Sequence, residues 1–266
     1  MKTRFSNEFV FQICALLLIT VLVHAMYTTV VRPNAQAQLA YEAAQREAGQ
    51  TVISQRSLSV VIADYEQEAC FILLFWALAT MGYKALQLRQ EQNLLSRNLL
   101  DISPGTTLLP QDARGLSRAL EALPEQEQER LLPRTLASAL QRFALTSDIP
   151  AVADTVREQC ELESDRLDSE LSMVRYIAWA IPSIGFIGTV RGIGDALAQA
   201  YKAVEGDITG VTVSLGVAFN STFVALVLSI ILMLCLHQLQ LSQERLSLNC
   251  QRYADKNLLR HLGALL

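Results

Sequence analysis

The sequence has few of the residues on which enzymes and nucleic-acid-binding proteins depend. Its 266 residues include three histidines, none with a Ser, Cys or carboxylate partner at the spacing of a known catalytic motif. The net charge is −4 and no basic stripe occurs, which gives no support to nucleic-acid binding. The five cysteines form no CxxC pair and have no histidine at metal-ligand spacing, so we interpret them as reduced thiols and expect no cofactor. These absences argue against an enzyme.

Charged residues are also scarce, at 18% against 51% hydrophobic residues, and the apolar residues are gathered in blocks. Blocks of this length are typical of membrane proteins rather than of globular ones. They predict four transmembrane helices, near residues 9–31, 69–83, 173–200 and 208–243. A cleaved signal peptide is the alternative for the first block. That block is long for a signal peptide and HAMYTTVV is a poor cleavage site, so we favour an uncleaved span.

The predicted fold is an all-α polytopic membrane protein whose third and fourth transmembrane helices extend as long helices into the cytoplasm. The fourth block has no formal charge before Glu244, which is too long for one crossing. The charged segment VREQCELESDRLDSELSMVRY reaches the third block without a helix breaker. The second block is short, and we expect Lys84 and Arg89 to lengthen it by extending toward the membrane interface.

Four spans place both termini on the same side of the membrane. That side, which includes the segment between the second and third spans, carries 17 Lys and Arg residues against 5 on the other side, so it is predicted to be cytoplasmic. We expect four regions: an N-terminal transmembrane hairpin with a periplasmic loop (1–83), a cytoplasmic helical insert (84–172), a core of two transmembrane helices (173–240) and a cytoplasmic C-terminal helix (241–266).

One apolar stretch is rich in glycine: IPSIGFIGTVRGIGD, residues 181–195. Each glycine costs a helix about 1 kcal/mol, so a simple membrane span has no use for them. Small residues at this spacing let another helix approach closely. On one face of this helix lie Pro182, Gly185, Thr189 and Gly192, and the fourth block repeats the spacing with Ser214, Ala218, Thr222, Ala225 and Ser229. The two stripes are either ordinary helix packing or a lining that a water chain or a partner carboxylate contacts.

The segment PSIGFIGTVRG resembles the P-x-x-G-x-x-G-T-V-x-G signature of the MotA/TolQ/ExbB proton channel family. The segment VAFNSTFVALVLSI resembles the second conserved helix of that family, and the resemblance covers residues 174–240. It implies that the hydroxyls of Thr189 and Thr222 face an ion path. It also implies a pore lining completed by Pro182, Gly185, Gly192, Ala218, Ala225 and Ser229.

The resemblance further implies partners. Family members form homopentamers around two copies of a single-span ExbD/TolR/MotB-like protein, and the proton motive force drives them. No Asp or Glu lies within the four apolar cores of this chain, so a titrating carboxylate has to come from another subunit. We therefore expect a proton channel subunit of a stator or energiser complex in the cell inner membrane, in contact with lipid and with a partner that has a transmembrane Asp.

A non-conducting membrane scaffold or receptor, whose cytoplasmic insert binds a partner protein, is the alternative. The process that is energised (protein transport, envelope integrity, motility or defence) and the choice between proton and sodium leave no motif in the sequence.

Four features depart from the family pattern or lack a clear role. Arg191 stands where ExbB-like sequences usually have an uncharged residue, and it either pairs with Asp195 one turn later or contacts the partner's carboxylate. His24, in the first span, is either a proton relay or a neutral histidine near the outer interface, since nothing close to it in sequence titrates. No proline follows Thr222, and the four spans resemble MotA more than ExbB and TolQ, which have three.

Overall fold

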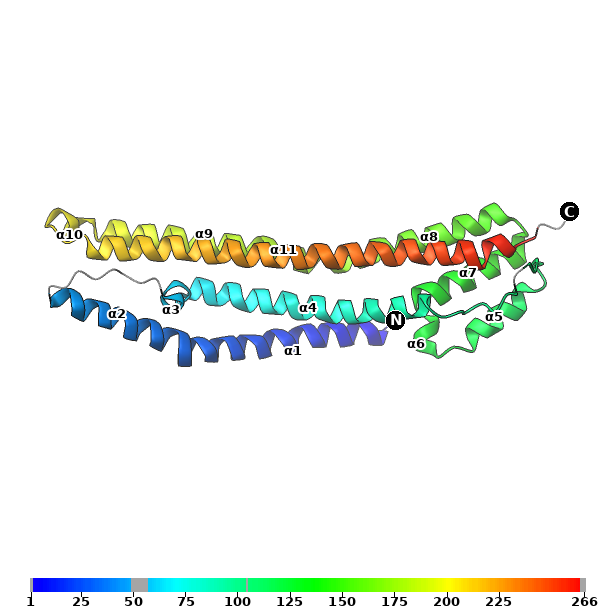
Figure 1. Ribbon diagram of the computed structural model, residues 1–266, viewed down its shortest axis with the longest axis horizontal. Coiled ribbons are helices and arrows are strands. Elements are labelled where there is room, and N and C mark those ends of the chain that lie inside the picture. The colour runs from blue at the N-terminus through cyan, green and yellow to red at the C-terminus, as the bar shows by residue number, and fades with distance from the viewer. Residues whose placement is uncertain (1, 49–56, 104, 264–266) are drawn as a thin grey trace. The chain divides into compact units, whose positions relative to one another are not determined.

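A computed structural model describes residues 2–48, 57–103 and 105–263. This part of the chain contains helices and no β-strand (Figure 1). Four helical runs are long and apolar enough to cross a membrane: Glu8–Gln45, Tyr65–Leu95, Ile149–Ala198 and Thr209–His261. The predicted fold class is confirmed, since the protein is an all-α polytopic membrane protein whose third and fourth runs are the longest, at 50 and 53 residues.

The described residues form two compact units. The first, here the membrane unit, comprises residues 1–81 and 173–236, and the second, the distal unit, comprises residues 82–172 and 237–266.

The first run of the membrane unit contains a widened turn. Helix α1 (Lys2–Met26) passes through a π-helical turn, η1 (Tyr27–Val31), into α2 (Arg32–Glu47). Pro33 explains the wide turn, because a proline inside a helix has no amide hydrogen and its ring clashes with the carbonyl four residues earlier, here that of Thr29. An extra residue in the turn relieves such a clash.

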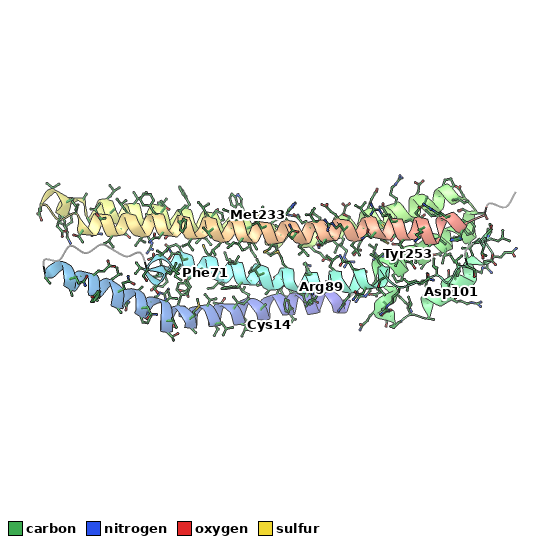
Figure 2. All side chains as sticks on the ribbon, viewed as in Figure 1. Cys14, Phe71, Arg89, Asp101, Met233 and Tyr253 are labelled. Carbon is green, nitrogen blue, oxygen red and sulfur yellow. The ribbon has the colours of Figure 1, made fainter. Side chains whose placement is uncertain are left out.

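Helix α4 (Tyr65–Leu95), preceded by the short α3 (Leu58–Val61), links the other membrane helices. Against α1, the indole Nε1 of Trp76 donates to the carbonyl of Gln12 at 3.1 Å, and Phe71 packs on a cluster of Val23, Tyr27 and Val31 (Figure 2). Against α9 (Ser172–Ala198), the thiol of Cys70 lies 3.6 Å from the carbonyl oxygen of Ile181. The N-terminal half of α4 is therefore held on two sides.

Large apolar side chains cover the outer faces of the membrane unit. Met233 on α11 (Thr209–Asn257) is one example, and others are Trp179, Phe186, Phe219, Phe223 and Ile230 (Figure 2). An apolar surface of this extent is the mark of a contact with lipid or with further subunits.

Helices α9 and α11 are joined by a short connection. Helix α10 (Ala200–Val204) is followed by Gly206, whose φ of +98° is a conformation that glycine adopts without strain. The carboxylate of Asp207 then accepts a hydrogen bond from the amide of Thr209 at 3.0 Å and caps α11. The chain therefore reverses, and α9 and α11 run antiparallel.

The distal unit is a set of shorter helices packed around α7. Its elements are α5 (Ala113–Glu121), α6 (Glu125–Gln128), α7 (Leu131–Thr146), α8 (Ile149–Glu170), the last turns of α4 and α11, and the 3₁₀ turn η2 (Leu259–His261). The side chains of Leu136, Leu140 and Phe143 on α7 are fully buried. Leu171 alone separates α8 from α9, so the prediction that the charged helix runs on into the third span is confirmed.

Candidate functional site

Helices α9 and α11 touch almost backbone to backbone. A Cβ atom added to the glycines of α9 would collide with the facing helix, at 2.4 Å from the Ala225 Cβ for Gly185, 2.6 Å from the Ser221 Cβ for Gly188 and 2.7 Å from the Ala218 Cβ for Gly192. Contacts below 3.0 Å are not tolerated by real side chains. The glycines are therefore necessary for this contact, as the packing interpretation of the stripe requires.

Two threonine hydroxyls meet at the edge of this contact. Oγ1 of Thr189 is hydrogen-bonded to Oγ1 of Thr222, and both side chains are half-buried. Thr222 also lies 3.0 Å from the carbonyl oxygen of Gly185, and Thr189 lies 3.1 Å from that of Ala218. The two hydroxyls have two protons to donate, and each oxygen keeps lone pairs that can accept. The contacts above engage both protons, so the pair can accept a hydrogen bond from a water molecule or an acid on its open side and can donate one only by releasing a carbonyl contact.

The remaining residues of the predicted lining are placed differently. Gly185, Gly192, Ala218 and Ala225 are buried in the α9–α11 contact, and the hydroxyl of Ser229 donates to the carbonyl of Ala178 at 3.1 Å. Pro182 is half-buried like the two threonines. The structure thus brings the two stripes together, and their part in a pore lining remains a prediction.

Arg191 lies two residues beyond Thr189 and binds a carboxylate of another helix. Its Nε and a terminal nitrogen lie 2.8 Å and 2.9 Å from the two carboxylate oxygens of Glu66 on α4, and Asp64 lies 3.7 Å away. The sequence suggested Asp195 as its partner, but no ion pair joins Arg191 to Asp195 in the described residues. A two-point contact suits the planar guanidinium better than an i,i+4 pair along one helix. Burial raises the pKa of Asp64, and Arg191 opposes that shift.

His24 has a titratable neighbour, contrary to what its sequence surroundings indicated. Its Nδ1 lies 2.7 Å from a carboxylate oxygen of Glu68, and the other oxygen of Glu68 binds Arg32. Glu66 and Glu68 are not among the functional candidates that the sequence predicts. The available signal was their position in the first turn of α4, at the edge of an apolar block.

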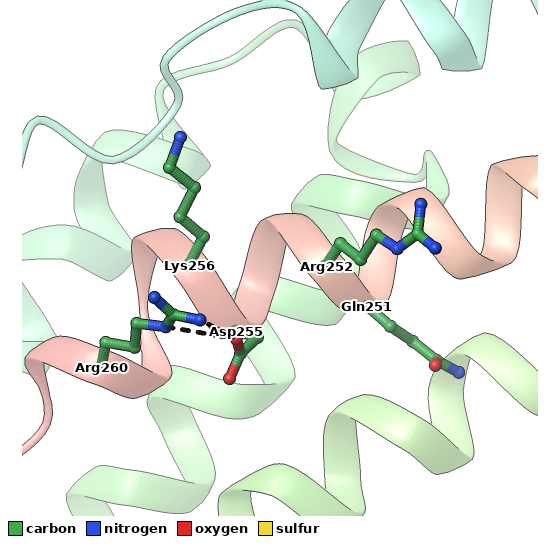
Figure 3. A pocket seen from close by; sticks show the side chains of 5 residues that line it. All are labelled: Gln251, Arg252, Asp255, Lys256 and Arg260. Atoms are coloured by element: carbon green, nitrogen blue, oxygen red, sulfur yellow. Dashed lines mark hydrogen bonds and ion pairs between the residues drawn. The ribbon is translucent and has the colours of Figure 1, made fainter.

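The distal unit has a shallow pocket at the end of α11 (Figure 3). It is lined by Gln251, Arg252, Asp255, Lys256 and Arg260, and the guanidinium of Arg260 binds Asp255 at 3.2 Å. None of the predicted site residues lies in it. Across the described ranges, no cluster of three or more His, Cys, Asp or Glu side chains is arranged to hold a metal ion.

The fold and the site define the class of the protein: a polytopic helical membrane protein built on two glycine-packed helices with a paired hydroxyl between them. A family profile described as the MotA/TolQ/ExbB proton channel family matches residues 125–252, which include both threonines. This match agrees with the family resemblance that the motif predicted. The match begins in α6, well before the segment in which the motif is recognisable. No curated protein and no solved structure matches the chain.

Proposed function

We propose that the chain is a proton-conducting channel subunit of a stator or energiser complex driven by the proton motive force in the cell inner membrane. The observation that carries this proposal is the meeting of the Thr189 and Thr222 hydroxyls on the open edge of the α9–α11 contact. Hydroxyls pass a proton along a hydrogen-bonded chain but do not hold one at neutral pH.

The acid in this proposal belongs to a partner. The apolar cores of the four spans contain no Asp or Glu, so the titrating group is the transmembrane Asp of an ExbD/TolR/MotB-like single-span protein. Five copies of this chain surround two copies of that partner. The exposed apolar faces of α9 and α11 supply the surface for neighbouring copies and for the partner. The termini and the 84–172 insert lie in the cytoplasm.

The test measures proton flux through the complex isolated with its partner and reconstituted in liposomes. With a potassium diffusion potential and an internal pH-sensitive dye, Thr189→Val and Thr222→Val are each expected to reduce flux at least about tenfold, a barrier change of about 1.4 kcal/mol. Thr189→Ser and Thr222→Ser keep the hydroxyl and retain flux. Thr212→Val is the matched control, because within the described residues the hydroxyl of Thr212 donates to the carbonyl of Ile208, just before α11, and makes no hydrogen bond to α9. Full flux in both valine variants contradicts the pore assignment.

The glycine contact favours a second candidate function, because close packing alone explains those glycines. In that case the chain is a non-conducting scaffold or receptor and the insert binds a partner protein. The parent complex then shows no dye response under the same potential. Mass spectrometry of the purified complex also separates the two, since only the channel requires a co-purifying single-span protein with an Asp in its apolar segment.

A further inference from the structure

Three ionisable side chains from the first two helical runs form a chain of contacts away from the threonine pair. His24 on α1 and Arg32 at the start of α2 hold the two oxygens of Glu68, which lies in the first turn of α4. Glu68 is buried and Arg32 is mostly buried, while the side chain of His24 is 59% exposed. A buried carboxylate is therefore connected to the surface through one imidazole.

The contacts determine which nitrogen of His24 is free to bind a proton. Arg32 binds the other oxygen of Glu68, and a carboxylate accepts hydrogen bonds but donates none. Nδ1 of His24 therefore donates to Glu68, which leaves Nε2 as the basic nitrogen of the neutral ring.

A buried hydroxyl beside this group has no protein partner. The side chain of Tyr27 has 0% exposure, and among the described residues its Oη has no hydrogen-bond partner. The Arg32 guanidinium lies 5.6 Å from the Tyr27 ring centre, and Glu68 is close enough to act on the hydroxyl electrostatically. Tyr27 also begins the π-helical turn, a distortion that is frequent at functional sites. A buried hydroxyl of this kind points to a bound water.

We propose that His24, Glu68 and Arg32 form a proton-binding site at the α2 end of the membrane unit, separate from the Thr189–Thr222 pair. One proton passes from water to Nε2 of His24 and converts the neutral imidazole to imidazolium. Nδ1 keeps its hydrogen bond, Glu68 remains a carboxylate and Arg32 remains a guanidinium.

Titratable groups from several elements surround this site. The titratable groups that face the site are Tyr27 of η1, Asp64 just before α4, Tyr65, Glu66 and Cys70 of α4, and Arg191 of α9. Among the charged groups, the carboxylates of Asp64, Glu66 and Glu68 face the guanidinium groups of Arg32 and Arg191. With His24 neutral, these five charged groups carry one net negative charge, and a proton on His24 balances it.

The test uses the full-length chain with ¹⁵N-labelled histidine rings in phospholipid vesicles. Solid-state NMR at a series of pH values follows the His24 ring, assigned from His24→Gln, with His237 and His261 as internal references. The neutral ring is expected to carry its proton on Nδ1. The imidazolium signal of the parent chain is expected to persist to a higher pH than in Glu68→Gln, because that substitution removes the negative charge that contacts Nδ1.

Glu66→Gln removes a nearby carboxylate that does not bond to His24, so it is expected to shift the transition less than Glu68→Gln does. A neutral ring protonated on Nε2, or the same transition pH in the parent and Glu68→Gln, overturns the proposal. The nitrogen that carries the proton of the neutral His24 ring is identified in the parent chain. This readout therefore tests the proposal even when Glu68→Gln does not fold. Neither readout requires conduction, which keeps this result distinguishable from a failure of the channel assignment.

Discussion

Replacing glycine by alanine is expected to have opposite effects on stability at two positions of α9 that are only nine residues apart. Gly185 faces Ala225 so closely that a methyl group does not fit, whereas Gly194 has nothing within 4 Å. We expect Gly185→Ala to lower the free energy of unfolding by about 1–3 kcal/mol through overpacking. Gly194→Ala is expected to raise it by about 0.5–1 kcal/mol through better helix propensity. Unfolding in mixed micelles, followed by circular dichroism, measures both, and a change of the same sign for the two variants contradicts the contact.

At the residue scale, spacing along one helix was sufficient to predict the two hydroxyls. Thr189 and Thr222 each lie on a stripe with a period of about 3.6 residues, and the structure brings the two stripes together. The partners of Arg191 and His24 could not be found in this way. They lie 125 and 44 residues away in the sequence and become neighbours only when α4 packs between helices. The rule that residues four apart on a helix form ion pairs assigns Asp195 to Arg191 instead.

At the scale of elements, a buried ion pair joins α4 to α8 inside the distal unit. The Nζ of Lys84 lies 2.8 Å from a carboxylate oxygen of Glu170, which Arg166 also binds, and the lysine side chain is 2% exposed. The short second apolar block predicted instead that this lysine extends to the membrane interface. Lys84→Met leaves Glu170 without its buried partner, and we expect a loss of about 3 kcal/mol in the stability of the distal unit.

Hydrogen exchange of the amides of α8 measures this loss, with Arg89→Met as the matched control, because Arg89 is exposed. Unchanged protection in Lys84→Met argues that Arg166 alone satisfies Glu170. A further Glu170→Leu substitution in the Lys84→Met chain is expected to restore part of the protection, since it removes the unpaired charge.

Helix boundaries were predicted less well than the helices themselves. Pro133 and Pro150 lie in the first turns of α7 and α8 and do not interrupt these helices, because a missing amide hydrogen has no cost there. The continuity of α1 through a π-helical turn into α2 was also not predicted, because it depends on how the chain accommodates Pro33.

For the whole molecule, the side of the membrane on which each segment lies is a direct experimental question. The charge bias predicts that the α10–α11 connection lies outside the cytoplasm and the distal unit inside it. In a background lacking the exposed Cys14 and Cys235, Glu205→Cys is expected to react with an impermeant maleimide in intact cells. Gln126→Cys in α6 reacts only after the membrane is opened. The reverse pattern shows that the topology is inverted.

The lengths of the apolar blocks in the sequence were sufficient to predict the four spans and the two long final helices. The extent of the family match was not predictable from the motif, because the match begins at residue 125, in the segment interpreted as an insert without readable motifs. Helix packing in that segment uses ordinary apolar residues such as Leu136 and Phe143, which many unrelated helical proteins share.

The glycine contact also limits how the membrane unit can move. Where long side chains separate two helices, the helices can shift past each other by repacking those chains, but α9 and α11 have almost nothing between their backbones. A slide by one residue, or a roll of one helix about its own axis, brings a larger side chain into a gap that holds only a hydrogen atom. Helices α9 and α11 therefore move as one rigid body. Any mechanical cycle of the protein has to displace them together, with the hydroxyl pair fixed in register.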